Sequence, residues 1–184
     1  MPQVPLPDPP LADAEVRLRP WALGDVPALT AACQDPEISR WTVVPREYTE
    51  LHATEFIATR EAERAAGREL SFAVVDRTDE LLGAIGMANF DRADRRGEIG
   101  YWMAREARQR GAGTRALRLL ARWAIEGLGL ERVELLANPE NEASQRLAER
   151  AGFTREGLLR RYRTRHGERE DLIMFSLLPE DLAS

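Results

Sequence analysis

The chain has 184 residues, 43% of them hydrophobic and 31% charged, as expected for one globular domain with a buried core. A net charge of −5 argues against a nucleic-acid-binding protein, and a single cysteine with two histidines excludes an internal disulfide and disfavours a metal site. Because no apolar run reaches the ~18 residues of a membrane span and no signal peptide is recognisable, we expect a cytosolic protein without a membrane partner.

The first 14 residues contain five prolines and little periodic hydrophobicity. We predict an extended or disordered tail over residues 1–14 and a single domain over residues 15–184. Val16-Arg17-Leu18 alternates as a strand does. Asp25 can cap a helix from Val26 to about Gln34, and Cys33 is expected to pack within it.

A loop is predicted from Ile38 to Tyr48, because this stretch contains Trp41 and Pro45 and shows no clear period. Its aromatic side chains could line an acceptor pocket or simply cover the core. Thr49 to Ala66 then has the pattern of a long helix, and Gly67 is a typical residue at its C-terminal end.

The second half of the chain alternates strand and helix patterns. Leu70–Val75, Leu81–Phe90 and Glu98–Met103 are predicted to form an antiparallel meander. An apolar face recurs at helical spacing from Leu117 to Leu128. The remaining elements are expected at Arg132–Ala137 (strand), Asn141–Ala151 (helix), Phe153–Tyr162 (strand) and Asp171–Leu177 (strand).

The stretch Arg108-Gln109-Arg110-Gly111-Ala112-Gly113-Thr114 separates the third meander strand from the helix. Its two glycines allow a sharp turn and close approach of a ligand, and the first amides of the helix are free to bind an anion. Residues 105–118 contain five arginines and one glutamate, in an otherwise acidic chain. The turn therefore indicates a phosphate-binding site, although arginines on a helix surface can equally be solvated.

Two kinds of phosphate-binding turn fit this stretch. Gly111 to Ala116 matches the G-x-G-x-x-A form of the dinucleotide fingerprint, and Glu134 lies about 20 residues further on. However, the whole of Ala104 to Arg110 separates the strand from the first glycine, and Glu134 lies inside a predicted strand. Dinucleotide binding is the weaker interpretation.

The same turn resembles the R/Q-x-x-G-x-G/A signature of the GNAT superfamily of acetyl-CoA-dependent N-acetyltransferases, through Arg108, Gly111 and Gly113. The segment Asn141-Glu142-Ala143-Ser144, with Gly152-Phe153 after it, is similar to the branch containing ribosomal-protein N-terminal acetyltransferases. The likeness covers roughly Glu15 to Leu178. It implies an α+β fold, with a central, mostly antiparallel mixed sheet of about seven strands flanked by about four helices.

The resemblance also implies a site. Glu98 would act as the base that takes the proton from the amine, directly or through water, and Ser144 would donate to the leaving thiolate. Ser144 matters because Ala148 stands where much of the family has a tyrosine. Each has a simpler alternative: a solvent-facing or arginine-paired strand carboxylate, and a serine that satisfies free helix amides. The implied coenzyme A contacts are the backbone groups of Tyr101, Trp102 and Met103 along the pantetheine arm, the turn residues Arg108, Gln109, Arg110, Gly111, Ala112, Gly113 and Thr114 at the pyrophosphate, and Asn141. Asn141 could be a helix cap, a pantetheine contact, or both.

Acetyl-CoA is the implied cosubstrate, and the amine attacks it directly, so Cys33 need not be acylated. The resemblance favours the N-terminal α-amino group of a protein or peptide as the acceptor. A small-molecule amine acetyltransferase, acting on an antibiotic or amino-acid derivative, and a non-catalytic acyl-CoA sensing module both stay open, as does a homodimer. The arginines of 160–167 could meet an acidic acceptor, but a solvated turn is the safer interpretation.

Overall fold

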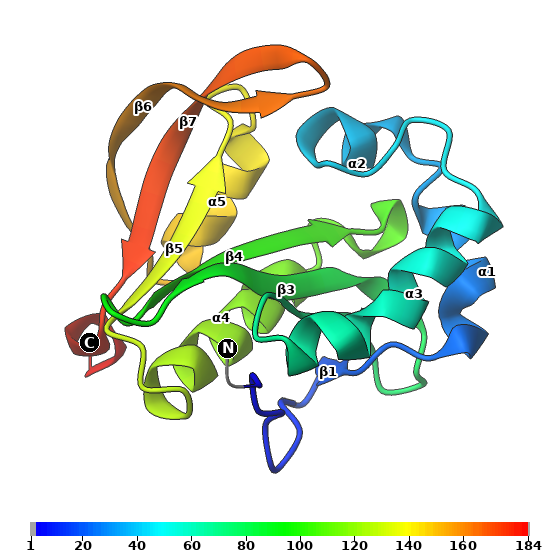
Figure 1. Ribbon diagram of the computed structural model, residues 1–184, viewed down its shortest axis with the longest axis horizontal. Coiled ribbons are helices and arrows are strands. Elements are labelled where there is room, and N and C mark those ends of the chain that lie inside the picture. Colours follow the sequence, from blue (N-terminus) through cyan, green and yellow to red (C-terminus); the bar gives the residue numbers. More distant parts are fainter. Residues whose placement is uncertain (1–2, 184) are drawn as a thin grey trace.

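The computed structural model describes residues 3–183 and builds them around a mixed β-sheet with helices packed on its faces (Figure 1). Within these residues, no helix is both long and apolar enough to cross a membrane. In chain order the elements are β1 (Arg17–Arg19), α1 (Val26–Ala32), α2 (Pro36–Trp41), α3 (Glu50–Ala65), β2 (Leu70–Val75), β3 (Leu81–Asp91), β4 (Arg96–Met103), α4 (Ala112–Glu126), β5 (Arg132–Ala137), α5 (Glu142–Arg150), β6 (Thr154–Arg165) and β7 (Glu168–Leu177).

The seven strands lie in the order β1-β2-β3-β4-β5-β7-β6. All neighbours are antiparallel except β4 and β5, which run parallel. A parallel pair needs a crossover connection, and α4 supplies it here. The predicted α+β fold with a mostly antiparallel mixed sheet is therefore confirmed.

Hydrophobic side chains form two separate clusters against the sheet. The larger contains the buried face of α4, where Leu117 and Leu120 are fully buried, as their helical spacing predicts. The smaller lies under α1 and α3 and includes Cys33. On β4, Tyr101 packs against the larger cluster and Trp102 against the smaller, because successive side chains of a strand point to opposite faces.

The proline-rich N-terminal segment, which we predicted as extended or disordered, has bends and an isolated β-bridge from Ala12 to Arg17 over its described part, residues 3–14; Met1 and Pro2 lie outside the described residues, as does Ser184 at the other end. Val4 is buried in the larger cluster. Its amide donates to the Arg64 carbonyl at 3.1 Å, and Arg64 Nη1 donates to its carbonyl at 2.7 Å. These contacts attach the segment to the end of α3.

The prediction of a loop over Ile38–Tyr48 was wrong for its first part, where α2 extends to Trp41. Asp35 caps this helix by accepting from the Glu37 amide at 3.1 Å, and Pro36 occupies its first turn. Six residues are too few to show a helical period, so only the cap could have revealed it. With α2, the described residues contain five α-helices where about four were expected.

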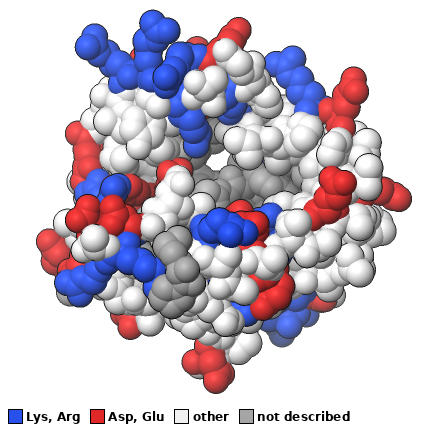
Figure 2. Space-filling model, in the orientation of Figure 1, with Lys and Arg blue, Asp and Glu red and all other residues white. Residues whose placement is uncertain are grey.

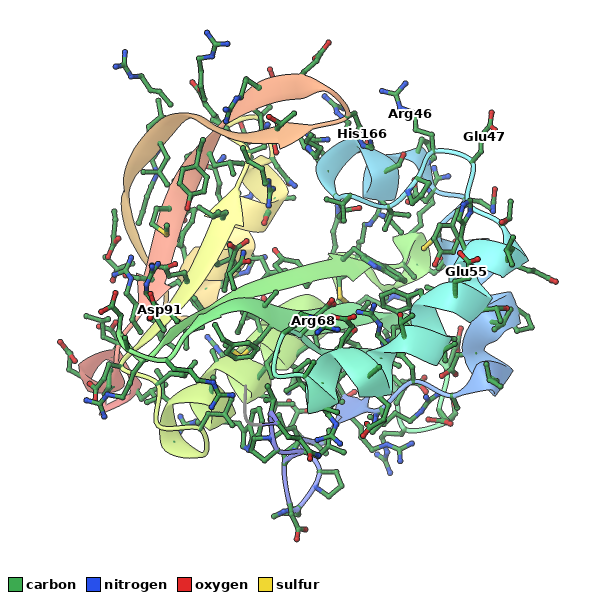
Figure 3. All side chains as sticks on the ribbon, viewed as in Figure 1. Arg46, Glu47, Glu55, Arg68, Asp91 and His166 are labelled. Carbon is green, nitrogen blue, oxygen red and sulfur yellow. The ribbon has the colours of Figure 1, made fainter. Side chains whose placement is uncertain are left out.

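The closing hairpin also differs from its predicted boundaries, because β6 continues to Arg165 and β7 begins at Glu168. Most of the arginine-rich stretch is therefore strand, and only His166 and Gly167 make the turn, both with positive φ. Arg165 pairs with Glu170 at 2.7 Å. The hairpin tip lies over α2, where a His166 ring nitrogen is 3.0 Å from the Ser39 carbonyl oxygen (Figure 3).

Candidate active site

The cavity at the centre of the molecule arises where β4 and β5 separate. Their parallel pairing covers only three residue pairs and ends at Glu98 and Glu134. Beyond this point β4 remains paired with β3, and β5 with β7. The two strands, the turn before α4, the first turns of α5 and the residues after α2 line a cavity of about 900 Å³. Figure 2 shows a hollow near the middle of this face, below arginines of the β6–β7 hairpin.

Glu98 lies on the cavity wall where the two strands separate. Asn89 Nδ2 donates to Glu98 Oε2 at 2.9 Å, and Arg163 Nη1 lies 3.9 Å from Oε1. The Glu98 side chain is 19% exposed, so it is neither solvent-facing nor sealed. Both partners leave acceptor capacity on the carboxylate. The geometry is compatible with a base that faces an amine in the cavity, and this role stays a prediction.

The turn before α4 has the free backbone donors that the glycines led us to expect. Gly111 stands at the N-cap with φ +81°, and no side chain caps the helix. In the part of the chain that the structure describes, no heavy atom outside its immediate neighbours lies within 4 Å of the position that a Cβ would take at Gly111. Gly111, Gly113 and Thr114 all line the cavity. Uncapped amides beside open space fit a phosphate group, and the residues present are therefore compatible with coenzyme A.

Arg108, which we expected near the pyrophosphate, is partly committed within the protein. Its Nε donates to the Met103 carbonyl at 3.1 Å, and its Nη2 lies 2.7 Å from Asp35 Oδ2. These contacts join the turn to β4 and to the cap of α2. Arg108 still lines the cavity and is 33% exposed, so the pairing leaves part of the guanidinium accessible.

From the sequence we inferred that the two glycines allow a ligand to approach closely. At Gly113 the structure gives a different reason for a small residue. Gly113 is buried in the first turn of α4, where a Cβ would lie 2.8 Å from Leu147 Cδ1 and 3.2 Å from Met103 Cγ. The need for a small residue therefore comes from packing α4 against α5 and β4. Close approach of a ligand explains the glycine at position 111 better than packing does.

We expect Gly113→Val to lower the free energy of unfolding by about 1–3 kcal/mol, because a β-branched side chain overpacks this contact. Gly113→Ala should be close to neutral: the end of Leu147 can move, and alanine gains about 1 kcal/mol of helix propensity. Urea unfolding measures both. A valine variant as stable as wild type would contradict the packing explanation.

The start of α5, with Asn141 and Ser144, lies beside Tyr101 of β4. Asn141 caps the helix by accepting from the Ser144 amide at 3.1 Å, so the predicted cap is confirmed. The Ser144 hydroxyl is 2.9 Å from the Tyr101 hydroxyl, and both residues line the cavity. Among the described residues, the Ser144 hydroxyl pairs with Tyr101 and not with a helix amide, which was the predicted alternative. Coenzyme A contacts by Asn141 stay a prediction.

The last residue of α2 and the residues after it contribute an apolar wall to the same cavity, formed by Trp41, Val43 and Val44. The Trp41 indole nitrogen donates to Glu37 Oε2 at 3.0 Å, and the Arg40 guanidinium lies 4.4 Å from the indole ring centroid. Of the two interpretations of this stretch, lining a pocket agrees with the position of Trp41, whereas Tyr48 is buried in the smaller cluster and covers the core. What the pocket accepts is a separate question.

Cys33 lies outside this cavity, in the smaller cluster at the end of α1. Burial raises the pKa of its thiol to about 12, so it stays protonated near neutral pH and is a poor nucleophile. Within residues 3–183, no three His, Cys, Asp or Glu side chains are grouped so as to hold a metal ion.

The sequence did not reveal which residues pair with Glu98 and Arg108. Asn89 and Arg163 at Glu98, and Asp35 at Arg108, come from distant segments and carry no local signal. The Tyr101 hydroxyl was also missed, since only its backbone was considered. Strand alternation could have placed its side chain on the α4 face of β4.

Comparison with known proteins agrees with this geometry. Residues 15–154 match the family model described as an acetyltransferase (GNAT) domain. The uncharacterized N-acetyltransferase p20 of Bacillus licheniformis is 31% identical over 167 residues, 90% of this chain and 94% of that protein. The ribosomal-protein-serine acetyltransferase of Escherichia coli K12 is 29% identical over 87 residues, 47% of this chain and 49% of that protein.

A solved structure extends the likeness to three dimensions. Mycobacterium smegmatis RimJ in complex with CoA-disulfide has a TM-score of 0.84 with this chain at 26% identity, covering 92% of this chain and 84% of the other. The residues matched by the family model include β4, the turn before α4, and α5, which are the elements around the cavity.

Proposed function

The chain belongs to the GNAT acetyltransferase family and is an acetyl-CoA-dependent N-acetyltransferase, and from this premise we propose that its acceptor is the N-terminal α-amino group of a protein or peptide. Its similarity to a ribosomal-protein-serine acetyltransferase and to RimJ supports a protein acceptor. Acetyl-CoA supplies the acetyl group as an activated thioester.

One observation carries the proposed chemistry: side chains from the two faces of β4 both reach the cavity. Glu98 lies on one face, and Tyr101, with its partner Ser144, lies on the other. A direct transfer needs a proton acceptor for the attacking amine and a donor for the departing sulfur. The arrangement supports these two roles on opposite sides of the opening between β4 and β5.

The proposed role of Glu98 concerns the proton on the acceptor amine. An α-amino group has a pKa of about 8, so most of it is protonated, and not nucleophilic, near neutral pH. We propose that Glu98 accepts this proton, directly or through water, while Asn89 holds the carboxylate in place. A lysine side chain has a pKa of about 10.4, so removal of its proton by the same carboxylate is less favourable.

The coenzyme A contacts follow from the free backbone groups. Among the described residues, no strand pairs with the edge of β4 that faces β5 beyond Glu98. Tyr101, Trp102 and Met103 could therefore pair through their backbone with an extended pantetheine arm. We propose that Gln109 to Thr114 hold the pyrophosphate through their amides, with Arg108 and Arg110 nearby and Asn141 beside the arm.

The acceptor is tested by thiol release from acetyl-CoA on a panel of peptides, polyamines and aminoglycosides. We expect turnover with a peptide that has a free N-terminus and none with the same peptide acetylated at its N-terminus, even where it contains a lysine. Because the 26 Lys and Arg residues of this chain are all arginines, the no-acceptor control cannot be confused by acetylation of its own lysines.

Two results would contradict the N-terminal assignment. Turnover with a polyamine or aminoglycoside alone would identify a small-molecule acetyltransferase. Tight acetyl-CoA binding with no turnover on any member of the panel would favour an acyl-CoA sensing module.

A further inference from the structure

A pair of hydroxyl groups joins the middle of β4 to the first turn of α5. The Tyr101 and Ser144 hydroxyl oxygens are 2.9 Å apart, and both residues line the cavity of about 900 Å³. The Ser144 amide is already used, since it donates to the cap residue Asn141 at 3.1 Å. The backbone of Ser144 is thereby fixed, and the remaining freedom lies in its hydroxyl group.

The tyrosine is the better donor of the two. A phenol, with an unperturbed pKa of about 10, is far more acidic than an aliphatic alcohol. Burial raises the pKa of Tyr101 to about 12, although the hydrogen bond with Ser144 and the charge of Arg150 act in the opposite direction. Tyr101 therefore keeps its proton near neutral pH. If Ser144 donated instead, the phenol hydrogen would need an acceptor other than Ser144.

A serine in a helix has a competing option. Its hydroxyl can turn back and donate to a backbone carbonyl one turn earlier. A hydrogen bond donated to the Ser144 oxygen still allows this backbone contact. It fixes the position of the oxygen, however, and the hydroxyl hydrogen can then point in another direction. Tyr101 approaches from the cavity wall on β4. The hydrogen of Ser144 is then free to point into the cavity.

We propose that Tyr101 is a positioning residue: by donating to Ser144 Oγ, it orients the Ser144 hydroxyl hydrogen toward the sulfur of coenzyme A. No covalent bond forms or breaks at Tyr101, and no proton leaves it. The inference rests on the proposed function, in which Ser144 donates to the leaving sulfur. It adds a side-chain role for a residue expected to act only through its backbone.

The direct test is the acidity of the thiol of bound coenzyme A, which needs no acceptor. A hydrogen bond to the anionic form lowers a pKa, so the bound thiol should be more acidic than a free thiol of about 8.5. The ultraviolet absorbance of the thiolate is titrated with saturating coenzyme A, and desulfo-coenzyme A serves as the blank for the tyrosines of the protein.

We expect Tyr101→Phe and Ser144→Ala each to raise the pKa of the bound thiol by about one unit, a tenfold loss of thiolate. The double variant should show no further shift, because both changes remove one hydrogen-bonding unit. The matched control is Tyr162→Phe, the same chemical change at a half-exposed position on β6 outside the cavity. It should leave the thiol pKa unchanged.

A shift in Ser144→Ala without one in Tyr101→Phe would overturn the positioning role, and so would additive shifts. Where turnover is found, Tyr101→Phe should lower kcat several-fold and leave the KM for acetyl-CoA unchanged; a change in KM alone would indicate a merely structural role. If wild type turns over no acceptor, the proposed function fails, and the thiol titration still decides the inference.

Discussion

The Glu98→Gln variant is expected to lose about a hundredfold or more in kcat/KM for the amine acceptor near neutral pH. Glutamine keeps the size of the side chain and an oxygen that can still accept from Asn89 Nδ2. It removes the charge and with it the ability to take a proton. The loss should therefore come from chemistry, with acetyl-CoA affinity unchanged.

The pH dependence distinguishes a base from a binding group. Below the pKa of the amine, the variant depends on the small unprotonated fraction, which falls tenfold per pH unit. The ratio of wild-type to variant kcat/KM should therefore grow as pH falls from about 9 to 6 and shrink as pH rises.

The control for this experiment is Glu126→Gln, which changes an exposed glutamate that pairs with Arg122 on α4. It should leave both rate and pH profile unaffected. A Glu98→Gln profile that parallels wild type across the pH range would remove Glu98 from proton transfer, whatever the size of the loss.

The parts of the fold that could be predicted are those with strong local periodicity. The buried face of α4 and the meander of β2, β3 and β4 carry clear helical and alternating patterns, and they formed where expected. The short helix α2 carries no such pattern, because six residues make fewer than two turns.

The closing hairpin shows a second limit. Its outer half is held by charge pairs between strands, such as Arg163 with Glu170 and Arg165 with Glu170, and not by alternating apolar residues. A run of arginines is compatible with both a turn and a strand. Only the partners on β7 decide between them, and partners on another strand are invisible to a local pattern.

The site shows the same division between local and tertiary information. The glycine turn before α4 and the cap at Asn141 are local signals, and both were predicted. The hydroxyl pair of Tyr101 with Ser144 joins residues 43 positions apart. Gly113 is instructive, because its sequence context suggested ligand approach, whereas its space is taken by Leu147 and Met103.

Gly111→Val is expected to weaken acetyl-CoA binding by about tenfold or more, measured by calorimetry. A Cβ at this position meets no atom of the described residues within 4 Å apart from its chain neighbours, so the new side chain would project into the space where we propose that the phosphates lie. The φ of +81° adds a backbone cost of about 1–2 kcal/mol for any residue other than glycine. Stability should therefore fall as well, and the two effects have to be separated.

Gly129 separates them, because it has a similar φ of +69° and a Cβ there would also meet no atom within 4 Å, but it does not line the cavity. Gly129→Val should lose a comparable free energy of unfolding, measured in urea, and keep the acetyl-CoA affinity of wild type. Equal affinities in the two folded variants would reject the turn at Gly111 as the phosphate site. A tenfold loss confined to Gly111→Val would tie the affinity to the space beside the first amides of α4, since the backbone strain is common to both variants.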